Sequence, residues 1–118
     1  MNMNNESRII RGIAASDGLA TGEAFVANSL EEARERPHID ILVVTYVTPD
    51  WIDILARCRS VVTDQGGRLS HPANLCRELG RPAVVGTEIA TKRIQSGDLV
   101  LVDGSRGLVE VLRSASSR

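Results

Sequence analysis

The sequence is poor in aromatic side chains and nearly balanced in charge. It contains one tryptophan, one tyrosine and one phenylalanine among 118 residues, and its formal net charge is −1. A surface that binds nucleic acid needs a basic patch, and binders of single strands add aromatic side chains on which bases stack. The composition therefore argues against a nucleic-acid partner.

Long apolar runs and a cysteine framework are also missing. A membrane-spanning helix needs about 20 consecutive apolar residues, and no segment approaches that length, while the opening residues lack a signal-peptide pattern. The two cysteines, Cys58 and Cys76, both fall in expected helices. Without a secretory signal we interpret them as reduced core thiols and expect no disulfide. These features predict a cytoplasmic protein without membrane contact.

What is present is the pattern of one small α/β domain. A hydrophobic fraction of 42% with 25% charged residues is ordinary for a globular chain of this length. Apolar β-branched runs alternate with short amphipathic segments, and no internal repeat is visible. We expect a sandwich or open barrel of short strands with flanking helices over residues 8–113, between a loose N-terminus at 1–7 and a disordered tail at 114–118.

Local signals place the individual elements. Ser29 and Glu32 form a capping box that starts a helix before Pro37. The segment 39–45 is mostly apolar and β-branched, which predicts a strand buried on both faces. The other expected strands are 8–11, 23–27, 59–63, 83–85, 99–102 and 108–112. The expected helices are 30–36, 48–58 with Trp51, Ile52 and Leu55 inward, 71–79 and 87–93, and turns are expected at 17–22.

The most informative stretch covers residues 63–86. A strand-like run enters it, the pair Gly66 and Gly67 follows, and Ser70 and His71 match the start of a helix. Glycine has no Cβ, so a ligand can approach the backbone closely there. The first turn of a helix carries unpaired N–H groups and a partial positive charge, which favour an anion. The layout predicts an anion held beside the nucleophilic imidazole of His71.

The expected helix after this loop is amphipathic. On a 3.6-residue period, its packed face carries Pro72, Leu75, Cys76 and Leu79. Its wet face carries Asn74, Arg77 and Glu78. His71 belongs to the rim between the two faces. Gly80 is the expected C′ residue that ends the helix.

These residues resemble a known motif. The pattern similar to it is Gly66-Gly67-x-x-Ser70-His71-x-Ala73-x-x-x-Arg77-Glu78-Leu79-Gly80-x-Pro82-Ala83-Val84-Val85-Gly86. It resembles the phosphohistidine motif of the phosphoenolpyruvate-utilising enzymes, namely phosphoenolpyruvate synthase, pyruvate phosphate dikinase, enzyme I of the sugar phosphotransferase system and rifampin phosphotransferase. Residues 12–22, 41–51 and 97–109 are similar to other blocks of that family. The chain departs from the pattern at Leu69, where Thr is usual, at Asn74, where an apolar residue is usual, and at Asp53, where Pro is common.

The resemblance implies a swivelling β/β/α domain that carries a phosphoryl group on a histidine, on Nε2 in that family. The expected function is that of a phosphocarrier domain or subunit of a phosphotransferase. Partner domains would bind Mg²⁺ with ATP or phosphoenolpyruvate, and a pyruvate-type substrate, whereas no cofactor or metal is expected on this domain. Met1 and the loose C-terminus favour a separate subunit that is inactive alone, with an excised domain as the alternative.

Individual roles follow from the motif. His71 is the expected phosphoryl acceptor, and the expected phosphate-binding residues are Gly66, Gly67, Arg68 and Ser70. Asp64 could orient the imidazole or stabilise a turn, and Thr48 could line the site or cap its helix. We expect Arg77 in a structural ion pair and His38 on the surface.

Two other functions stay open. One is a non-catalytic binding or scaffold module that keeps the fold, which the departures at Leu69 and Asn74 favour. The other is a small hydrolase using Ser70 and His71, for which no oxyanion site or third group is evident. The sequence has no P-loop lysine motif and no metal-binding carboxylate cluster. It does not identify the final acceptor, for which pyruvate, water, a phenol, an antibiotic or a sugar-system protein all fit.

Overall fold

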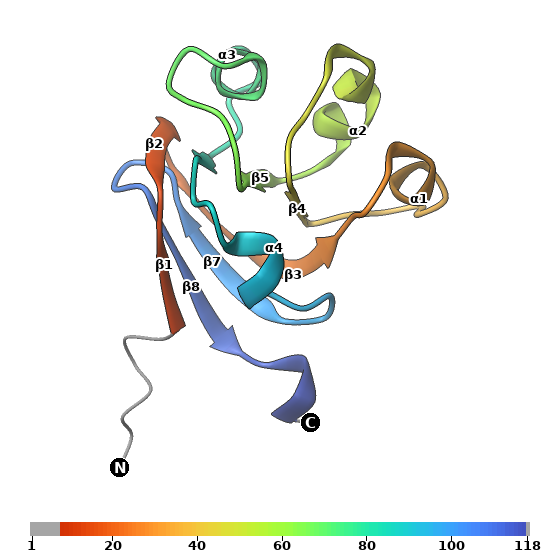
Figure 1. Ribbon diagram of the computed structural model, residues 1–118, viewed down its shortest axis with the longest axis vertical. Coiled ribbons are helices and arrows are strands. Elements are labelled where there is room, and N and C mark those ends of the chain that lie inside the picture. Colours follow the sequence, from red (N-terminus) through yellow and green to blue (C-terminus); the bar gives the residue numbers. More distant parts are fainter. Residues whose placement is uncertain (1–7, 118) are drawn as a thin grey trace.

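The computed structural model describes residues 8–117, which form one mixed sheet flanked by short helices (Figure 1). Its eight strands follow the order β1-β8-β7-β3-β4-β5-β6-β2. The strands are β1 (Ile9–Arg11), β2 (Ile13–Ser16), β3 (Leu19–Val26), β4 (Ile41–Val44), β5 (Ser60–Thr63), β6 (Ala83–Val85), β7 (Leu99–Asp103) and β8 (Leu108–Arg113). The two end strands, β1 and β2, are consecutive in the chain and meet at Gly12, so the sheet curls back toward itself.

The sheet has a parallel and an antiparallel part that share β3. Residues 19–23 of β3 pair antiparallel with β7, and Ala24–Val26 pair parallel with β4. Strands β4, β5 and β6 continue the parallel part, whereas β7, β8 and β1 continue the antiparallel part. Parallel strands point their carboxyl ends to one edge of a sheet, which gathers the loops after β4, β5 and β6 there.

The helices are α1 (Leu30–Arg34), α2 (Ile52–Arg57), α3 (His71–Leu79) and α4 (Ala90–Arg93), with 3-10 turns η2 (Pro49–Trp51) and η3 (Ala115–Ser117). Helices α1, α2 and α3 lie side by side along the top and right of Figure 1. The expected α/β fold of short strands with flanking helices is therefore confirmed.

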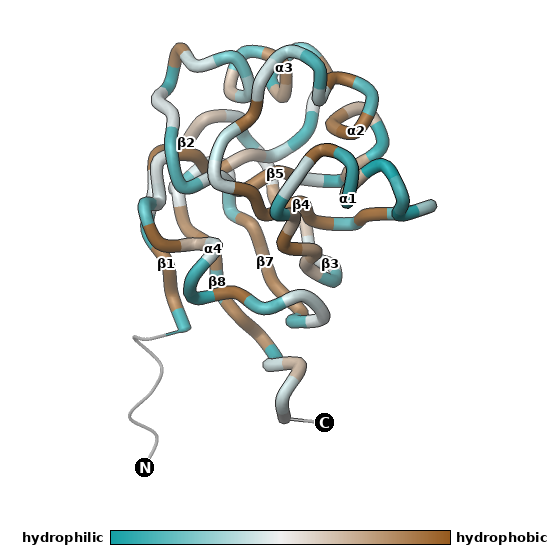
Figure 2. Tube along the Cα trace, turned by 45° about the vertical axis from the view of Figure 1, so that its right-hand side comes forward, coloured by the Kyte–Doolittle hydropathy of each residue, from teal (hydrophilic) through white to brown (hydrophobic). Residues whose placement is uncertain are grey.

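Strand β4 separates two apolar cores. Leu42 and Val44 pack toward α1, α2 and α3, while Ile41 and Val43 pack toward the antiparallel strands and α4. All four side chains are buried, as the sequence predicts for this segment. Figure 2 shows the hydrophobic residues concentrated along the strands, with hydrophilic residues on the helices and loops outside them.

The region before β4 differs from the prediction. Residues 13–16 form β2, which was not expected, and the turn expected over 17–22 is confined to Asp17 and Gly18, because β3 already begins at Leu19. Leu19–Gly22 lack strong strand propensity, but their pairing with Val100–Asp103 supplies the missing hydrogen bonds. Pairing with a distant strand therefore overrides the local glycine signal.

The second helix and the C-terminal tail also differ in detail. The predicted helix 48–58 divides into η2 and α2, and the tighter 3-10 turn changes its phase. Ile52 is consequently 49% exposed instead of inward, and Ile54 is buried in its place. Within the tail expected to be disordered, the N–H of Ala115 donates to Asp98 at 2.8 Å, and η3 follows. Residue 118 and the expected loose segment 1–7 lie outside the described residues.

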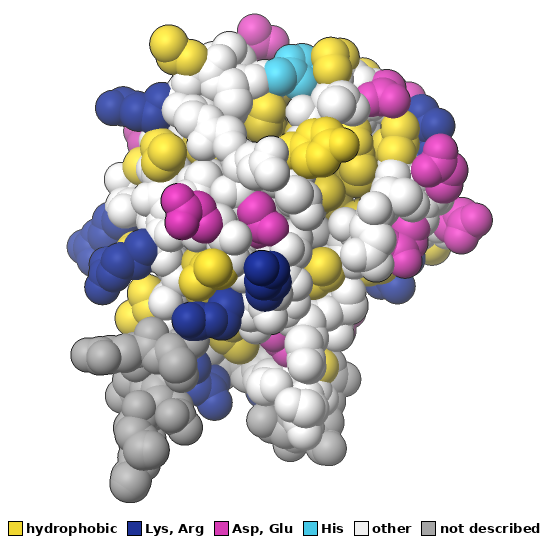
Figure 3. Space-filling view, in the orientation of Figure 1, with side chains coloured by type: hydrophobic (Ala, Val, Ile, Leu, Met, Phe, Trp, Pro, Cys, Tyr) yellow, Lys and Arg dark blue, Asp and Glu magenta, His cyan; other side chains and the backbone are white. Residues whose placement is uncertain are grey.

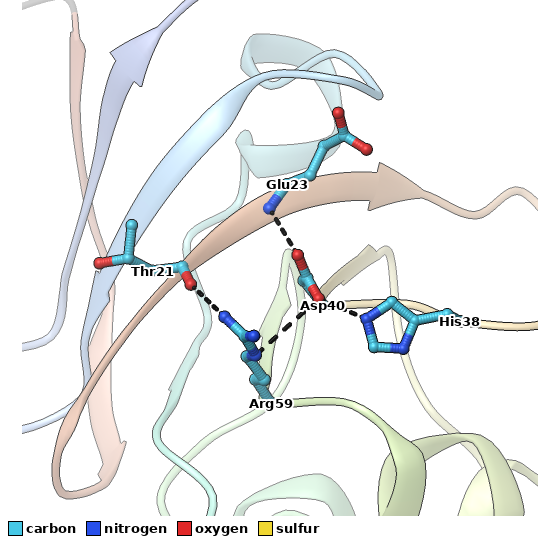
Figure 4. A network of polar contacts seen from close by, with 5 residues as sticks. All are labelled: Thr21, Glu23, His38, Asp40 and Arg59. Atoms are coloured by element: carbon cyan, nitrogen blue, oxygen red, sulfur yellow. Dashed lines mark hydrogen bonds and ion pairs between the residues drawn. The ribbon is translucent and has the colours of Figure 1, made fainter.

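A polar network fixes the amino ends of β4 and β5 (Figure 4). Where β3 changes partner from β7 to β4, the N–H of Glu23 donates to the carboxylate of Asp40 at 3.2 Å. His38 Nε2 contacts the same carboxylate at 2.6 Å, and Arg59 lies 3.8 Å from it and donates to the carbonyl of Thr21 at 2.9 Å. Burial raises the pKa of Asp40, but these hydrogen bonds and the charge of Arg59 outweigh it and hold that pKa below its usual value.

Candidate functional site

His71 lies at the carboxyl edge of the parallel strands. It is the first residue of α3 and follows β5 through the loop 64–70, and its side chain is exposed. Figure 3 shows a histidine side chain at the surface beside hydrophobic side chains on the face over α3 and α2. Ligands of α/β sheets commonly bind outside the carboxyl ends of the strands, so this edge is a suitable place for chemistry.

The two glycines of the loop differ in whether the fold could accept a side chain at that position. Gly66 has a φ of +118°, and a Cβ there would lie 3.2 Å from Ser70 Oγ. Gly67 lies outside the left-handed region, and a Cβ added to it would meet nothing within 4 Å. The fold of the domain therefore requires glycine at position 66 and not at position 67.

The start of α3 leaves backbone donors free. Ser70 is the N-cap residue, but its hydroxyl donates to the carbonyl of Gly67 at 2.7 Å and caps no helix amide. Pro72 has no N–H, and the N–H of Asn74 bonds to Ser70 at 3.0 Å. Within residues 8–117, the N–H groups of His71 and Ala73 are left without a partner. These groups and the helix dipole suit a negatively charged ligand.

The hydroxyl of Ser70 also bears on the hydrolase alternative. Because its proton goes to the Gly67 carbonyl, Ser70 does not donate to the imidazole of His71. A serine nucleophile needs a base within hydrogen-bond reach. The observed geometry therefore gives no support to a serine–histidine pair.

Arg77 makes hydrogen bonds where an ion pair was expected. Its Nη1 donates to the carbonyl of Ala15 on β2 at 2.7 Å, and its Nη2 donates to the carbonyl of Arg68 at 2.9 Å. Nη2 also contacts Asn74 Oδ1, and Asn74 Nδ2 donates to the carbonyl of Leu69 at 3.3 Å. Sequence reasoning placed Arg77 and Asn74 on the wet face of α3 correctly but missed these partners, which only the folded loop brings near.

The two candidate orienting residues are engaged elsewhere. The Asp64 carboxylate is buried and accepts the N–H of Thr91 at 2.9 Å and its hydroxyl at 2.5 Å, which fixes the start of α4. Thr48 donates to the carboxylate of Asp50 and thereby lowers the pKa of Asp50. In the part of the chain that the structure describes, neither residue bonds to His71.

Both cysteine thiols are buried in the core. Cys58 and Cys76 are free and buried, and burial raises the pKa of Cys58 to about 12 and that of Cys76 to about 11. Both therefore remain protonated and serve as core residues, as predicted. Across residues 8–117, no three His, Cys, Asp or Glu side chains are arranged to hold a metal ion. No helix in the same range combines the length and the apolar character needed to span a bilayer.

Comparison with known proteins agrees with this geometry. The family model described as "PEP-utilising enzyme, mobile domain" matches residues 37–107. A probable phosphoenolpyruvate synthase of Pyrococcus abyssi (strain GE5 / Orsay) is 46% identical over 101 residues, which cover 86% of this chain and 12% of that protein. YvkC, an uncharacterized phosphotransferase of Bacillus subtilis (strain 168), is 42% identical over 109 residues, which cover 92% of this chain and 13% of that protein.

A solved structure is similar as well. The NMR structure of an Enzyme I protein superposes with a TM-score of 0.59 and 34% identity, over 68% of this chain and 33% of that one. The chain thus spans about one eighth of the length of the two curated relatives. The loop with His71 and all of α3 lie inside the matched region. The chain therefore belongs to the mobile-domain family of the PEP-utilising enzymes.

Proposed function

We propose that this domain relays a phosphoryl group through His71. The observation that carries the proposal is the exposed imidazole at the start of α3, next to the partnerless N–H groups of His71 and Ala73. A phosphoryl group on that ring would meet both free donors and the positive end of the helix dipole. The membership of the chain in the mobile-domain family supports the same role.

The transfer has two steps. A ring nitrogen of His71 donates its lone pair to the phosphorus of the donor, and the donor's P–O bond breaks with its electron pair leaving on oxygen. The acceptor then attacks the phosphorus, and the P–N electron pair returns to the imidazole. Arg68 and the backbone N–H groups at Gly66 and Gly67 stabilise the equatorial oxygens, which carry most of the charge in phosphoryl transfer. Ser70 was also expected to bind the phosphate, but its hydroxyl and its N–H both donate to the carbonyl of Gly67, so its role is to hold the loop.

Partner domains supply the rest of the reaction. The relative from Pyrococcus abyssi is named as a phosphoenolpyruvate synthase, and this chain spans 12% of its length. We assign Mg²⁺ with ATP or phosphoenolpyruvate to a donor domain, and a pyruvate-type acceptor to a second domain. The chain itself lacks a P-loop lysine motif, which is consistent with donor binding elsewhere.

The test uses a donor that needs no partner. Phosphoramidate should transfer its phosphoryl group to the isolated domain and release ammonia, giving one acid-labile phosphate by mass spectrometry. His71→Ala should remove the label without changing the circular dichroism. His38→Ala is the matched control, because His38 is the other histidine of the chain and its loss should leave the label intact. Label that persists in His71→Ala would refute the proposal.

A further inference from the structure

Three successive carbonyl groups of the loop before His71 are held by donors from Ser70 and α3. The carbonyl of Gly67 accepts the hydroxyl of Ser70 at 2.7 Å and its N–H at 3.0 Å. The next carbonyl, of Arg68, accepts Nη2 of Arg77 at 2.9 Å, and that of Leu69 accepts Nδ2 of Asn74 at 3.3 Å. The loop is thus fixed by side chains that follow it in the sequence.

These contacts determine where the amides point. In a planar trans peptide, the C=O group and the N–H of the next residue point to opposite sides, and the described chain has no cis peptide. Arg77 holds the carbonyl of Arg68 toward α3, so the N–H of Leu69 points to the opposite side. Ser70 holds the carbonyl of Gly67, which fixes the N–H of Arg68 in the same way. Among the described residues these two N–H groups have no partner, so the loop before His71 carries two further free donors.

Among the described residues, Arg77 forms no ion pair with an acidic side chain. Within residues 8–117, the ion pairs join His38 and Arg59 to Asp40, and Arg106 to Asp103. Both Nη atoms of Arg77 instead bind neutral oxygens, on β2, on the loop and on Asn74. A planar guanidinium can bridge β2 and the loop at once, which the single ammonium of a lysine cannot do with the same geometry.

We infer that Arg77 is a positioning residue that aims the N–H of Leu69 at the phosphoryl group on His71, and that Asn74 supports it by contacting its Nη2 and holding the Leu69 carbonyl. The inference rests on the proposed function. It separates these two side chains from a direct role in docking or phosphate binding, because the observed contacts commit them to the backbone. It also gives Asn74, the departure from the usual apolar residue, a specific task.

The experiment compares the isolated wild-type domain with Arg77→Lys and Asn74→Ala. Arg77→Lys keeps the charge and loses the planar fork of donors, and Asn74→Ala removes the contacts with the Leu69 carbonyl and with Arg77 at an exposed helix position. Arg93→Lys and Glu78→Ala are the matched controls, on exposed positions of α4 and α3. Two readouts are taken, namely the amide shifts in 1H–15N NMR during titration with inorganic phosphate, and the rate of labelling by phosphoramidate.

In the wild type, phosphate should shift the amides of Arg68, Leu69 and His71. In both test variants the phosphate affinity reported by the Leu69 amide, and the labelling rate, should fall about five- to tenfold, the equivalent of one hydrogen bond. The controls should behave as the wild type, and a normal urea midpoint should show that each variant folds. Wild-type affinity at the Leu69 amide in both variants would overturn the inference. If the wild type never labels but the effect at the Leu69 amide holds, the proposed function fails and the positioning role of Arg77 and Asn74 stands.

Discussion

Leu69 exposes 85% of its side chain two positions before His71, where the family motif usually has Thr. Such exposure shows that the side chain does not contribute to the core, so replacing it should leave the fold intact. We predict that Leu69→Thr raises the rate of phosphoramidate labelling or the lifetime of the phosphohistidine. One added hydrogen bond is worth about 1 kcal/mol, so the gain should be several-fold at most. An unchanged rate and lifetime would mean that the hydroxyl cannot reach the phosphoryl group.

Substitutions at Gly66 and Gly67 should separate effects on folding stability from effects on phosphoryl transfer. Gly67→Ala should leave the free energy of unfolding within about 0.5 kcal/mol of the wild type, because its Cβ would enter open space. The same methyl group would stand where the phosphoryl group and its donor approach, so labelling should slow. Gly66→Ala is the comparison, and the left-handed φ of +118° should make it destabilising by roughly 1 kcal/mol or more. Wild-type labelling in a folded Gly67→Ala would show that bare backbone at Gly67 serves no transfer role.

Single residues were predictable where the signal is local. Gly80 adopts φ 70° and ψ 30° at the end of α3, as its position before Pro82 indicates. The partners of Asp64 and Arg77 were not predictable, because Thr91 and Ala15 lie 27 and 62 residues away. A polar residue next to a motif invites a functional role, and only the folded chain shows which neighbour takes its hydrogen bonds.

At the scale of elements, segments whose hydrophobic residues follow one clear pattern were predicted correctly. The four-residue core of β4 and the amphipathic helix α3 both carry such patterns. Strand β2 and the start of β3 do not, because Ala, Gly and Thr there gain their strand structure from β6 and β7. Their positions depend on pairing across the whole chain, which the local sequence does not encode.

The junction of β3, β4 and β5 gives a prediction for acid stability. The pKa of Asp40 is lowered from 3.8 in the fold, so the carboxylate stabilises the folded state above that pH and loses this contribution as the pH falls through the lowered value. Asp40→Asn should therefore be destabilising by roughly 1 kcal/mol at pH 7. The difference should shrink as the pH falls through that lowered pKa, where Asp40 of the wild type takes up its proton.

Urea unfolding at pH 7 and at low pH measures this difference, with Asp17→Asn, an exposed acid, as the control. Asp17→Asn should be close to the wild type at both pH values. An equal loss for Asp40→Asn at all pH values would assign the effect to packing beside Gly22, where an added Cβ would lie 2.6 Å from the Asp40 Cβ, and not to charge.

At the scale of the molecule, the candidate site lies at one edge of the parallel strands and the Asp40 network at the other. Of the five exposed large apolar side chains among the described residues, Tyr46, Ile52 and Leu69 belong to the loops and helix starts at the carboxyl edge, as His71 does. Beside them, an open groove of about 900 Å³ is lined by β2 residues together with Arg68, Leu69 and Arg77. The Asp40 network closes the opposite ends of β4 and β5. The proposed relay requires His71 to reach two partners in turn, and this separation would allow docking without disturbing the core.

The last prediction concerns that docking. The isolated domain should not label with ATP or phosphoenolpyruvate, even with Mg²⁺, and adding the partner domains from the same source should make labelling rapid and dependent on His71. Each contact should be small and short-lived, because tight binding would prevent the move to the second site. Arg68→Glu should slow labelling from the partner by more than it slows labelling from phosphoramidate, since Arg68 is exposed beside the loop that the donor must reach.

Arg93→Glu, a charge reversal on α4, is the control and should change neither rate. Equal losses with both donors would place Arg68 on the phosphoryl group and not at the interface. If partner domains bind tightly and never label His71, the chain is a binding or scaffold module that keeps the fold, because a carrier must release its partner to complete the relay. The two rates together thus distinguish a docking residue, a phosphate ligand and a domain that keeps the fold without the transfer.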